Sequence, residues 1–216
     1  MCGNLRLERF NYFSGEPALP FNKIEVRYFS SIHQRNVVPG LQIPVIFSIP
    51  ETGGREVRIQ ALYWGVPDNF RPGQLIYNAR SEKIGKKGPW SSAYKKRRAL
   101  VMASSFCEGG QDFQVGNGGP FAIGAIWGIR RDYNDVVLLT CRANKAVEPT
   151  HGRMPLIIAK RDYLTWLDEK TPLNTLAPLL RPLEEKYTHL IGGGSLDPPE
   201  ENESDAGISM YSPGEG

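Results

Sequence analysis

Two apolar runs in the second half of the chain, FAIGAIWGI at residues 121–129 and VVLLT at residues 136–140, decide the fold class. Each has the length and composition of a buried β-strand. Helices are expected only near the end of the apolar region, at residues 161–167 and 176–183. Further strands are expected at residues 45–49, 57–66, 99–103 and 156–158. We therefore predict an α+β fold with a predominantly antiparallel, barrel-like sheet and a few short helices.

Composition divides the 216 residues into a globular body and a tail. Residues 1–191 carry nearly all the apolar side chains, and we expect them to form one domain. Residues 192–216 are rich in Gly, Pro and Ser and contain six acids but no Lys or Arg, which is typical of a flexible appendage. Without this tail the formal charge rises from +3 to +9. A basic body of this kind favours a polyanionic partner.

Several classes of protein are excluded by the same survey. The longest stretch without a charge, residues 113–129, is interrupted by glycines and includes Gln114 and Asn117, so we expect no membrane-spanning helix. No signal peptide is expected, which favours a cytoplasmic location. The three cysteines are an odd number without metal-ligand spacing, so we expect neither a disulfide framework nor a bound metal.

Cys2 is the first candidate for chemistry. If Met1 is removed, Cys2 carries an α-amine and a thiol on adjacent carbons. An α-amine titrates near pH 7.7–8.0, so part of it is neutral and nucleophilic at pH 7. Such a pair can condense with an aldehyde to an imine, which the thiol then closes to a five-membered thiazolidine. The alternative is that Cys2 has no role and lies in a frayed terminus.

Three further segments carry suitable side chains, each with a plain structural alternative. Asn78 offers hydrogen-bond donors and acceptors and Arg80 a planar fork suited to phosphate, or both belong to a solvated turn with an Arg–Glu pair. Glu108 follows an apolar run and could be a general acid of raised pKa, or a strand-end carboxylate facing water. His151 and Arg153 lie in a loop before another apolar run, where a lone histidine is usually structural.

A basic stretch at residues 83–98 is the last candidate. It combines cations with two aromatic residues, the composition of a groove for single-stranded nucleic acid. A solvated basic loop explains the composition equally well. Its members are Lys83, Lys86, Lys87, Trp90, Tyr94, Lys95, Lys96, Arg97 and Arg98.

These segments, in this order, resemble the SOS-response-associated peptidase (SRAP) family over the whole body of the chain. Each motif is short, but the set in register is specific. The matching pieces are Met1-Cys2-Gly3, Asn36-Val37-Val38-Pro39-Gly40, Trp64-Gly65, Asn78-Ala79-Arg80-Ser81-Glu82, Arg98 through Phe106 to Glu108, Thr140-Cys141-Arg142-Ala143-Asn144, and His151-Gly152-Arg153-Met154-Pro155.

The resemblance implies a monomeric sensor of abasic sites in single-stranded DNA that needs no cofactor and joins the nucleoid when it binds. The resemblance also implies that Met1 is removed by self-processing and that the new N-terminal cysteine is linked to the sugar aldehyde. The implied roles are nucleophile for Cys2, amine ligand for Asn78, proton shuttle for Glu108, ring opening for His151, phosphate binding for Arg80 and Arg153, base stacking for Pro39 and Phe70, and DNA contacts for Trp64 and Arg98.

The chain departs from the family pattern at three positions and at its end. Asn4 replaces an arginine, while Cys107 and Gly109 replace the aromatic residues that flank the glutamate. The family's C-terminal motif has no clear counterpart after His189. Two other functions stay open, a cysteine peptidase acting on other proteins and a non-covalent single-strand binder.

Overall fold

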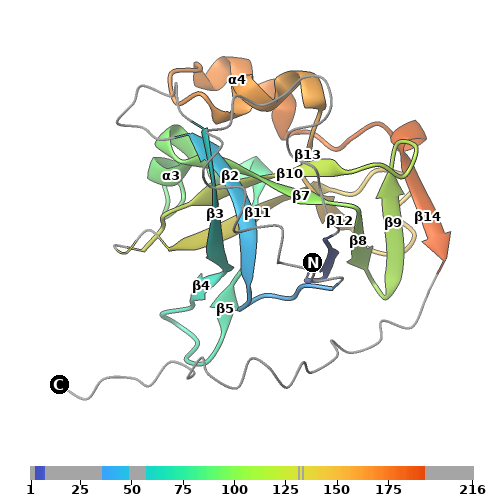
Figure 1. Ribbon diagram of the computed structural model, residues 1–216, viewed down its shortest axis with the longest axis horizontal. Coiled ribbons are helices and arrows are strands. Elements are labelled where there is room, and N and C mark those ends of the chain that lie inside the picture. Colours follow the sequence, from blue (N-terminus) through green and yellow to red (C-terminus); the bar gives the residue numbers. More distant parts are fainter. Residues whose placement is uncertain (1–2, 8–35, 49–56, 131, 133, 193–216) are drawn as a thin grey trace.

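The apolar runs of the sequence form the strands of one large curled sheet (Figure 1). The computed structural model describes residues 3–7, 36–48, 57–130, 132 and 134–192. The strands of the large sheet are β2 (Gln42–Ser48), β3 (Val57–Trp64), β6 (Asn78–Arg80), β7 (Arg98–Ala103), β10 (Phe121–Trp127), β11 (Asp135–Arg142), β12 (Arg153–Pro155) and β13 (Ile157–Ile158). Their order is β12-β11-β3-β2-β7-β10-β13, and β6 pairs with β11 off this path.

The large sheet curls because β10, near one end of the strand order, pairs not only with its neighbour β7 but also with β11, near the other end of the order. Ala125 lies opposite Ala99 of β7 on one side and opposite Leu138 of β11 on the other. Most pairings are antiparallel, and the parallel pairings of the described strands are those of β11 with β3 and with β6. The prediction of a mainly antiparallel, barrel-like sheet is confirmed, although the ring of strands is not a closed barrel.

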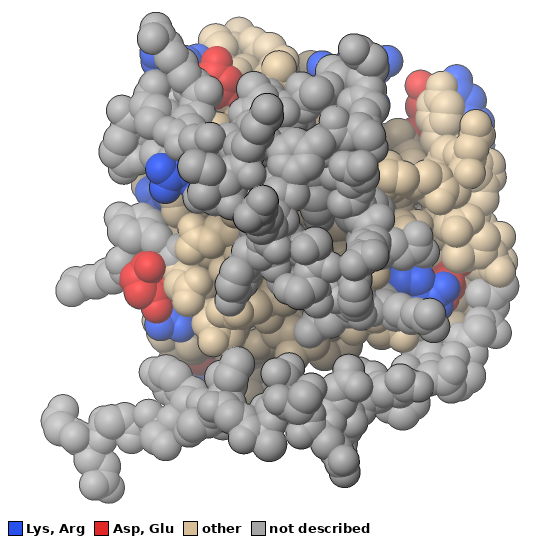
Figure 2. Space-filling view, viewed as in Figure 1, with Lys and Arg blue, Asp and Glu red and all other residues tan. Residues whose placement is uncertain are grey.

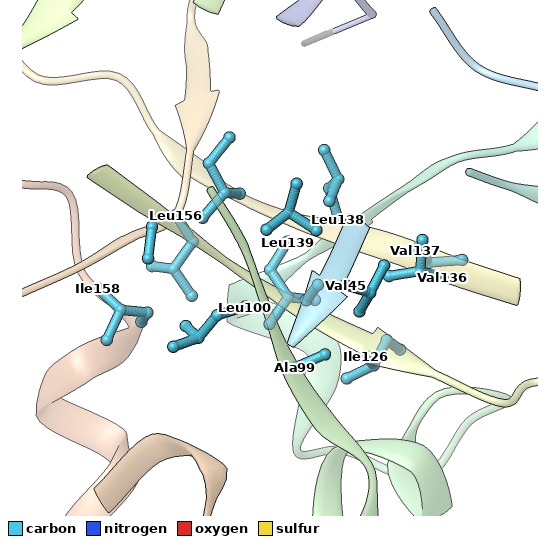
Figure 3. Packing of buried hydrophobic residues seen from close by; sticks show 14 of the residues in the cluster. Val45, Ala99, Leu100, Ile126, Val136, Val137, Leu138, Leu139, Leu156 and Ile158 are labelled. Atoms are coloured by element: carbon cyan, nitrogen blue, oxygen red, sulfur yellow. The ribbon is translucent and has the colours of Figure 1, made fainter. Parts of the chain in front are cut away.

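Buried apolar side chains on both faces of the central strands form the hydrophobic core (Figure 3). Val45, Leu100, Ile126 and Leu138 come from four different strands, and each is 0–1% exposed. Complete burial of one such side chain contributes about 1.5–3 kcal/mol relative to leaving it in water. Strands β10 and β11 come from apolar runs because nearly all of their residues are buried, whereas β3 alternates in part because Arg58 and Gln60 are exposed.

A smaller sheet, which the sequence analysis did not predict, carries part of the candidate site. Its order is β1-β8-β9-β14, and all its pairings are antiparallel. Its strands are β1 (Leu5–Arg6), β8 (Ser105–Glu108), β9 (Gln111–Val115) and β14 (Thr188–Gly192). A separate hairpin joins β4 (Val66–Pro67) to β5 (Leu75–Ile76). These strands are short or carry polar residues at every other position, so they lack an apolar run.

The helices are short, as expected. They are α2 (Ser81–Ile84), α3 (Ser91–Lys96), α4 (Tyr163–Leu167) and α5 (Leu173–Leu176), with 3-10 turns η2 (Lys160–Asp162), η3 (Ala177–Leu180) and η4 (Glu185–Tyr187). The helix expected at 176–183 instead begins at Leu173 and continues as η3 to Leu180. It ends there because Arg181 precedes a proline and is extended. None of the described helices is both long and apolar enough to cross a membrane.

The sequence analysis assigned Arg98 to DNA, but the structure places its side chain in the core. The side chain is 1% exposed, and its guanidinium donates hydrogen bonds to backbone carbonyls. The acceptors are Tyr94 at 2.7 Å, Lys95 at 2.8 Å, Trp166 at 2.6 Å and Asp168. Arg98 therefore joins the end of α3 to the end of α4, and its burial leaves no surface for a phosphate.

Arg98→Ala should lower the free energy of unfolding by about 3 kcal/mol, because buried carbonyls lose a charged donor. The measurement is urea denaturation. Lys96→Ala, which removes an exposed cation at the end of α3, two residues before Arg98, is the matched control and should stay within about 0.5 kcal/mol of wild type. Equal stability of the two variants would contradict the structural role of Arg98.

Candidate functional site

A buried carboxyl group beside an imidazole forms the centre of the site. Glu108 is the last residue of β8 and is 1% exposed. Its Oε2 lies 3.1 Å from Nδ1 of His151. Burial raises the pKa of Glu108, and the positive charges of His151 and Arg153 oppose that rise. The alternative that Glu108 is a strand-end carboxylate facing water is therefore wrong, and the group has the environment of a general acid or base.

The imidazole of His151 is held by the backbone of its own loop. The backbone N–H of His151 donates to the carbonyl of Val147 at 3.0 Å, and the backbone N–H of Val147 donates to Oδ1 of Asn144 at 3.2 Å. Nδ1 lies 3.1 Å from the Arg153 N–H and 3.0 Å from the Arg153 carbonyl. Nδ1 thus has an acceptor when it carries a proton and a donor when it does not. The backbone of the loop therefore accommodates either tautomer of the ring.

Gly109 allows the turn after Glu108 to lie directly against the loop that carries His151. Its φ is +57°, a conformation that glycine adopts readily. A Cβ at this position would lie 2.7 Å from Cγ2 of Thr150 and 3.1 Å from its carbonyl oxygen. The Thr150 hydroxyl also donates to the Gln111 side chain at 2.7 Å. The glycine that departs from the family pattern is therefore required by the close contact between turn and loop.

Arg153 is held by a carboxylate that the sequence analysis did not pair with it. Its Nη1 and Nη2 donate to the two carboxylate oxygens of Glu82 at 2.7 and 3.0 Å. Nη2 also donates to the carbonyl and hydroxyl of Thr140, at 2.6 and 3.0 Å. Partial burial raises the pKa of Glu82, but the hydrogen bonds and charge of Arg153, together with backbone hydrogen bonds, outweigh it and leave the pKa lowered. A phosphate bound by Arg153 would have to share the guanidinium with Glu82.

Strand β6 places Asn78 and Arg80 next to these groups. β6 runs parallel to β11, with Asn78 opposite Leu138 and Arg80 opposite Thr140. Thr140 is also the residue whose oxygens bind Arg153. Arg80 is exposed, whereas Asn78 is partly buried. The structure thus brings Asn78, Arg80 and Arg153 to one region through β11.

Cys2 lies outside the described residues. The described segment that follows it in sequence, residues 3–7, contains β1, which pairs with β8. The carbonyl of Asn4 accepts a hydrogen bond from the Cys107 N–H at 3.1 Å. Neither described thiol is easily ionised. Burial raises the pKa of Cys107, and Asp112 raises it further. Burial also raises the pKa of Cys141 to about 12.

The aromatic residues assigned to DNA lie in different environments. Trp64 is 0% exposed and donates its indole N–H to the Tyr77 carbonyl at 3.0 Å, so its assignment to DNA is wrong. Phe70 is 93% exposed at the tip of the β4–β5 hairpin, where its backbone N–H donates to Asp68 at 2.9 Å. Pro39 is partly exposed in a turn. Phe70 and Pro39 can be reached by a base.

Neither a single basic patch on the face drawn in Figure 2 nor a metal centre is formed by the described residues. On the face drawn in Figure 2, described basic atoms lie in separate groups, several beside acidic atoms. In the part of the chain that the structure describes, no three His, Cys, Asp or Glu side chains are placed to hold a metal ion.

Glu108→Gln should remove a fall in stability with rising pH. Because the pKa of Glu108 is raised, the folded state binds more protons than the unfolded state above the ordinary value of 4.5. The contribution of Glu108 to wild-type stability therefore falls as pH rises from that value through the raised pKa, whereas glutamine does not titrate. The measurement is the free energy of unfolding in urea between about pH 4 and pH 8.

Glu82→Gln is the control of opposite sign. The pKa of Glu82 is lowered, so its contribution is present above the ordinary value and lost as pH falls through the folded value. This variant should flatten the acidic limb of the stability profile only. A Glu108→Gln profile parallel to wild type over the whole range would show that Glu108 titrates normally.

Curated proteins, solved structures and a family model are similar to this chain. Two curated relatives, both named abasic site processing protein YoqW, come from Bacillus subtilis strain 168 and Bacillus phage SPbeta, and each is 24% identical over 85% of this chain and 88% of its own length. A solved structure from Bacteroides thetaiotaomicron has a TM-score of 0.68 at 19% identity, covering 88% of this chain and 90% of its own. A phage-related protein from Bordetella bronchiseptica has a TM-score of 0.62 at 18% identity, covering 92% of this chain and 100% of its own. A family model described as SOS response associated peptidase (SRAP) matches residues 1–191. The chain therefore belongs to the SRAP family.

Proposed function

We propose that this protein recognises abasic sites in single-stranded DNA and links Cys2 covalently to the ring-opened deoxyribose after Met1 is removed. The observation that carries the proposal is the buried Glu108–His151 pair at the end of β8, the strand along which the N-terminal strand runs. The name of the two YoqW relatives and membership of the SRAP family support the same substrate.

The register between β1 and β8 supports Cys2 as the nucleophile. Leu5 lies opposite Phe106, and the next carbonyl, that of Asn4, binds the Cys107 N–H. In an antiparallel ladder each step back along one strand is a step forward along the other. By this register Gly3, the residue after Cys2, corresponds to Glu108.

Glu108 supplies the proton transfers that this chemistry needs. The neutral α-amine of Cys2 attacks the sugar aldehyde and forms a carbinolamine. Protonated Glu108 gives its proton to the departing hydroxyl, so water leaves and an iminium forms. The resulting carboxylate takes the thiol proton as sulfur bonds to the iminium carbon. The electron pair of the C=N bond returns to nitrogen, which leaves a neutral thiazolidine and regenerates protonated Glu108.

The other residues act before and around this step. His151 takes the proton of the C1 hydroxyl as C1=O forms and the C1–O4 bond breaks, and it returns that proton to O4, which leaves as the C4 hydroxyl. Asn78 holds the α-amine. Arg80 and Arg153 bind the flanking phosphates, with Glu82 fixing the direction of the Arg153 fork. Pro39 and Phe70 offer apolar surface to neighbouring bases.

Removal of Met1 is the peptidase reaction that we assign to the chain, by self-processing at the same site. We assign this function to the domain formed by residues 1–191. The protein acts as a monomer in the cytoplasm, and it lies at the nucleoid when it is bound to DNA. A peptidase for other proteins would cleave an unrelated peptide. A non-covalent binder would retain its full complex with DNA when Cys2 is replaced by alanine.

Glu108→Gln should slow formation of the covalent adduct by about 10²–10⁴-fold, because glutamine keeps the shape but transfers no proton. The measurement is a time course of denaturant-resistant adduct with an abasic oligonucleotide at saturating concentration. Cys107→Ser is the control and should react at the wild-type rate, since the thiol next to Glu108 has a raised pKa. A wild-type rate for Glu108→Gln would assign the proton transfers to another group.

A further inference from the structure

A pocket with a volume of about 330 Å³ lies beside the candidate site, between β6 and the start of α3. This volume is at the lower end of the range found for small-ligand sites, which is sufficient for one nucleotide. The described residues that line it are Asn78, Ala79, Arg80, Lys83, Ile84, Lys86, Lys87, Gly88, Pro89, Trp90 and Ser91.

The charge of the pocket favours an anion. Four of its lining residues are cations: Arg80, Lys83, Lys86 and Lys87. None of the described residues that line it is acidic, and none of the four cations forms an ion pair with a described carboxylate. The nearby carboxylate of Glu82 is held by Arg153.

Trp90 gives the pocket an aromatic wall. It immediately precedes α3, packs partly against the core and is only partly buried. Pro89 and Ile84 extend the apolar surface beside it. Tyr94 is 2% exposed and Arg98 1%, so these two members of the basic stretch belong to the core and not to the pocket. Cations beside an exposed aromatic face are the combination that binds a base and its phosphate.

Strand β6 connects the pocket to the candidate site. Asn78 and Arg80 line the pocket and are also assigned to the site. Arg80 lies opposite Thr140, whose oxygens bind Arg153. Because Asn78 and Arg80 belong to both the pocket and the site, a DNA strand bound at the site would also pass the pocket.

We infer that this pocket is a subsite for a nucleotide flanking the abasic site, with its base on Trp90 and its phosphates at Lys83, Lys86 and Lys87. The inference rests on the proposed function and adds a specific requirement to it. Affinity should depend on a base, and not only on a phosphate, at one position beside the lesion.

The first test compares two triple variants of equal charge. Lys83, Lys86 and Lys87 are changed together to alanine, and Lys145, Lys160 and Lys170, which are exposed elsewhere, are changed together as the control. Binding of a single strand with a non-reactive tetrahydrofuran abasic analogue is measured by fluorescence anisotropy across a range of salt concentrations. The pocket variant should bind more weakly and lose about 0.7 of salt slope for each phosphate contact removed. Equal behaviour of the two variants would overturn the subsite.

The second test separates stacking from folding. Trp90→Leu should weaken binding by roughly 5- to 100-fold, and Trp90→Phe should restore much of it. A second tetrahydrofuran residue, placed 5′ or 3′ of the first, then removes one flanking base and keeps its phosphate. At one of the two positions wild type and Trp90→Leu should become equal in affinity. An equal loss for Trp90→Leu on all three oligonucleotides would assign Trp90 to structure alone.

A failed subsite is distinguishable from a failed function. Wild-type protein is incubated in parallel with a reactive abasic oligonucleotide. If adduct forms while the pocket variants match their controls, the subsite is wrong and the proposed function holds. If wild type forms no adduct, the proposed function fails whatever the pocket binds.

Discussion

The contact between Glu108 and His151 is the constraint around which the site is arranged. The charged form of a carboxyl group with 1% exposure is unfavourable unless a cation lies beside it, so the group otherwise keeps its proton. Oε2 has the imidazole at 3.1 Å, and the imidazole is fixed by the loop in which it lies. That loop depends on Asn144, which accepts the Val147 N–H and donates to the Leu183 carbonyl at 3.0 Å and the Thr188 hydroxyl at 2.9 Å. The C-terminal segment and the site are therefore stabilised together.

The large sheet could be predicted from sequence because burial leaves a local mark. The run at residues 121–129 is apolar because β10 is paired on both edges and packed on both faces. The smaller sheet leaves a weaker mark. Strand β9 reads Gln-Asp-Phe-Gln-Val, and its stability comes from pairing with β8 and with the distant β14. Such non-local pairing cannot be seen in a short window of sequence.

The site was predictable where a residue type alone suggests its chemistry. Glu108 and His151 were selected as separate candidates, and the structure places them in contact. The Arg153–Glu82 pair was not predicted, because 71 residues separate its members and no local pattern relates them. Arg98 shows the opposite error. A basic run indicates charge, but only the fold decides which cation enters the core and which faces solvent.

The central claim is that a free N-terminal Cys2 bonds to the abasic sugar, and intact-mass spectrometry tests it most directly. We expect purified protein to have the mass of the chain without Met1. After incubation with an abasic single strand, a species heavier by the oligonucleotide minus one water should appear and survive denaturation. Cys2→Ala should give no such species. Retention of Met1 in protein that still forms the adduct, or an adduct of equal yield with Cys2→Ala, would contradict the account.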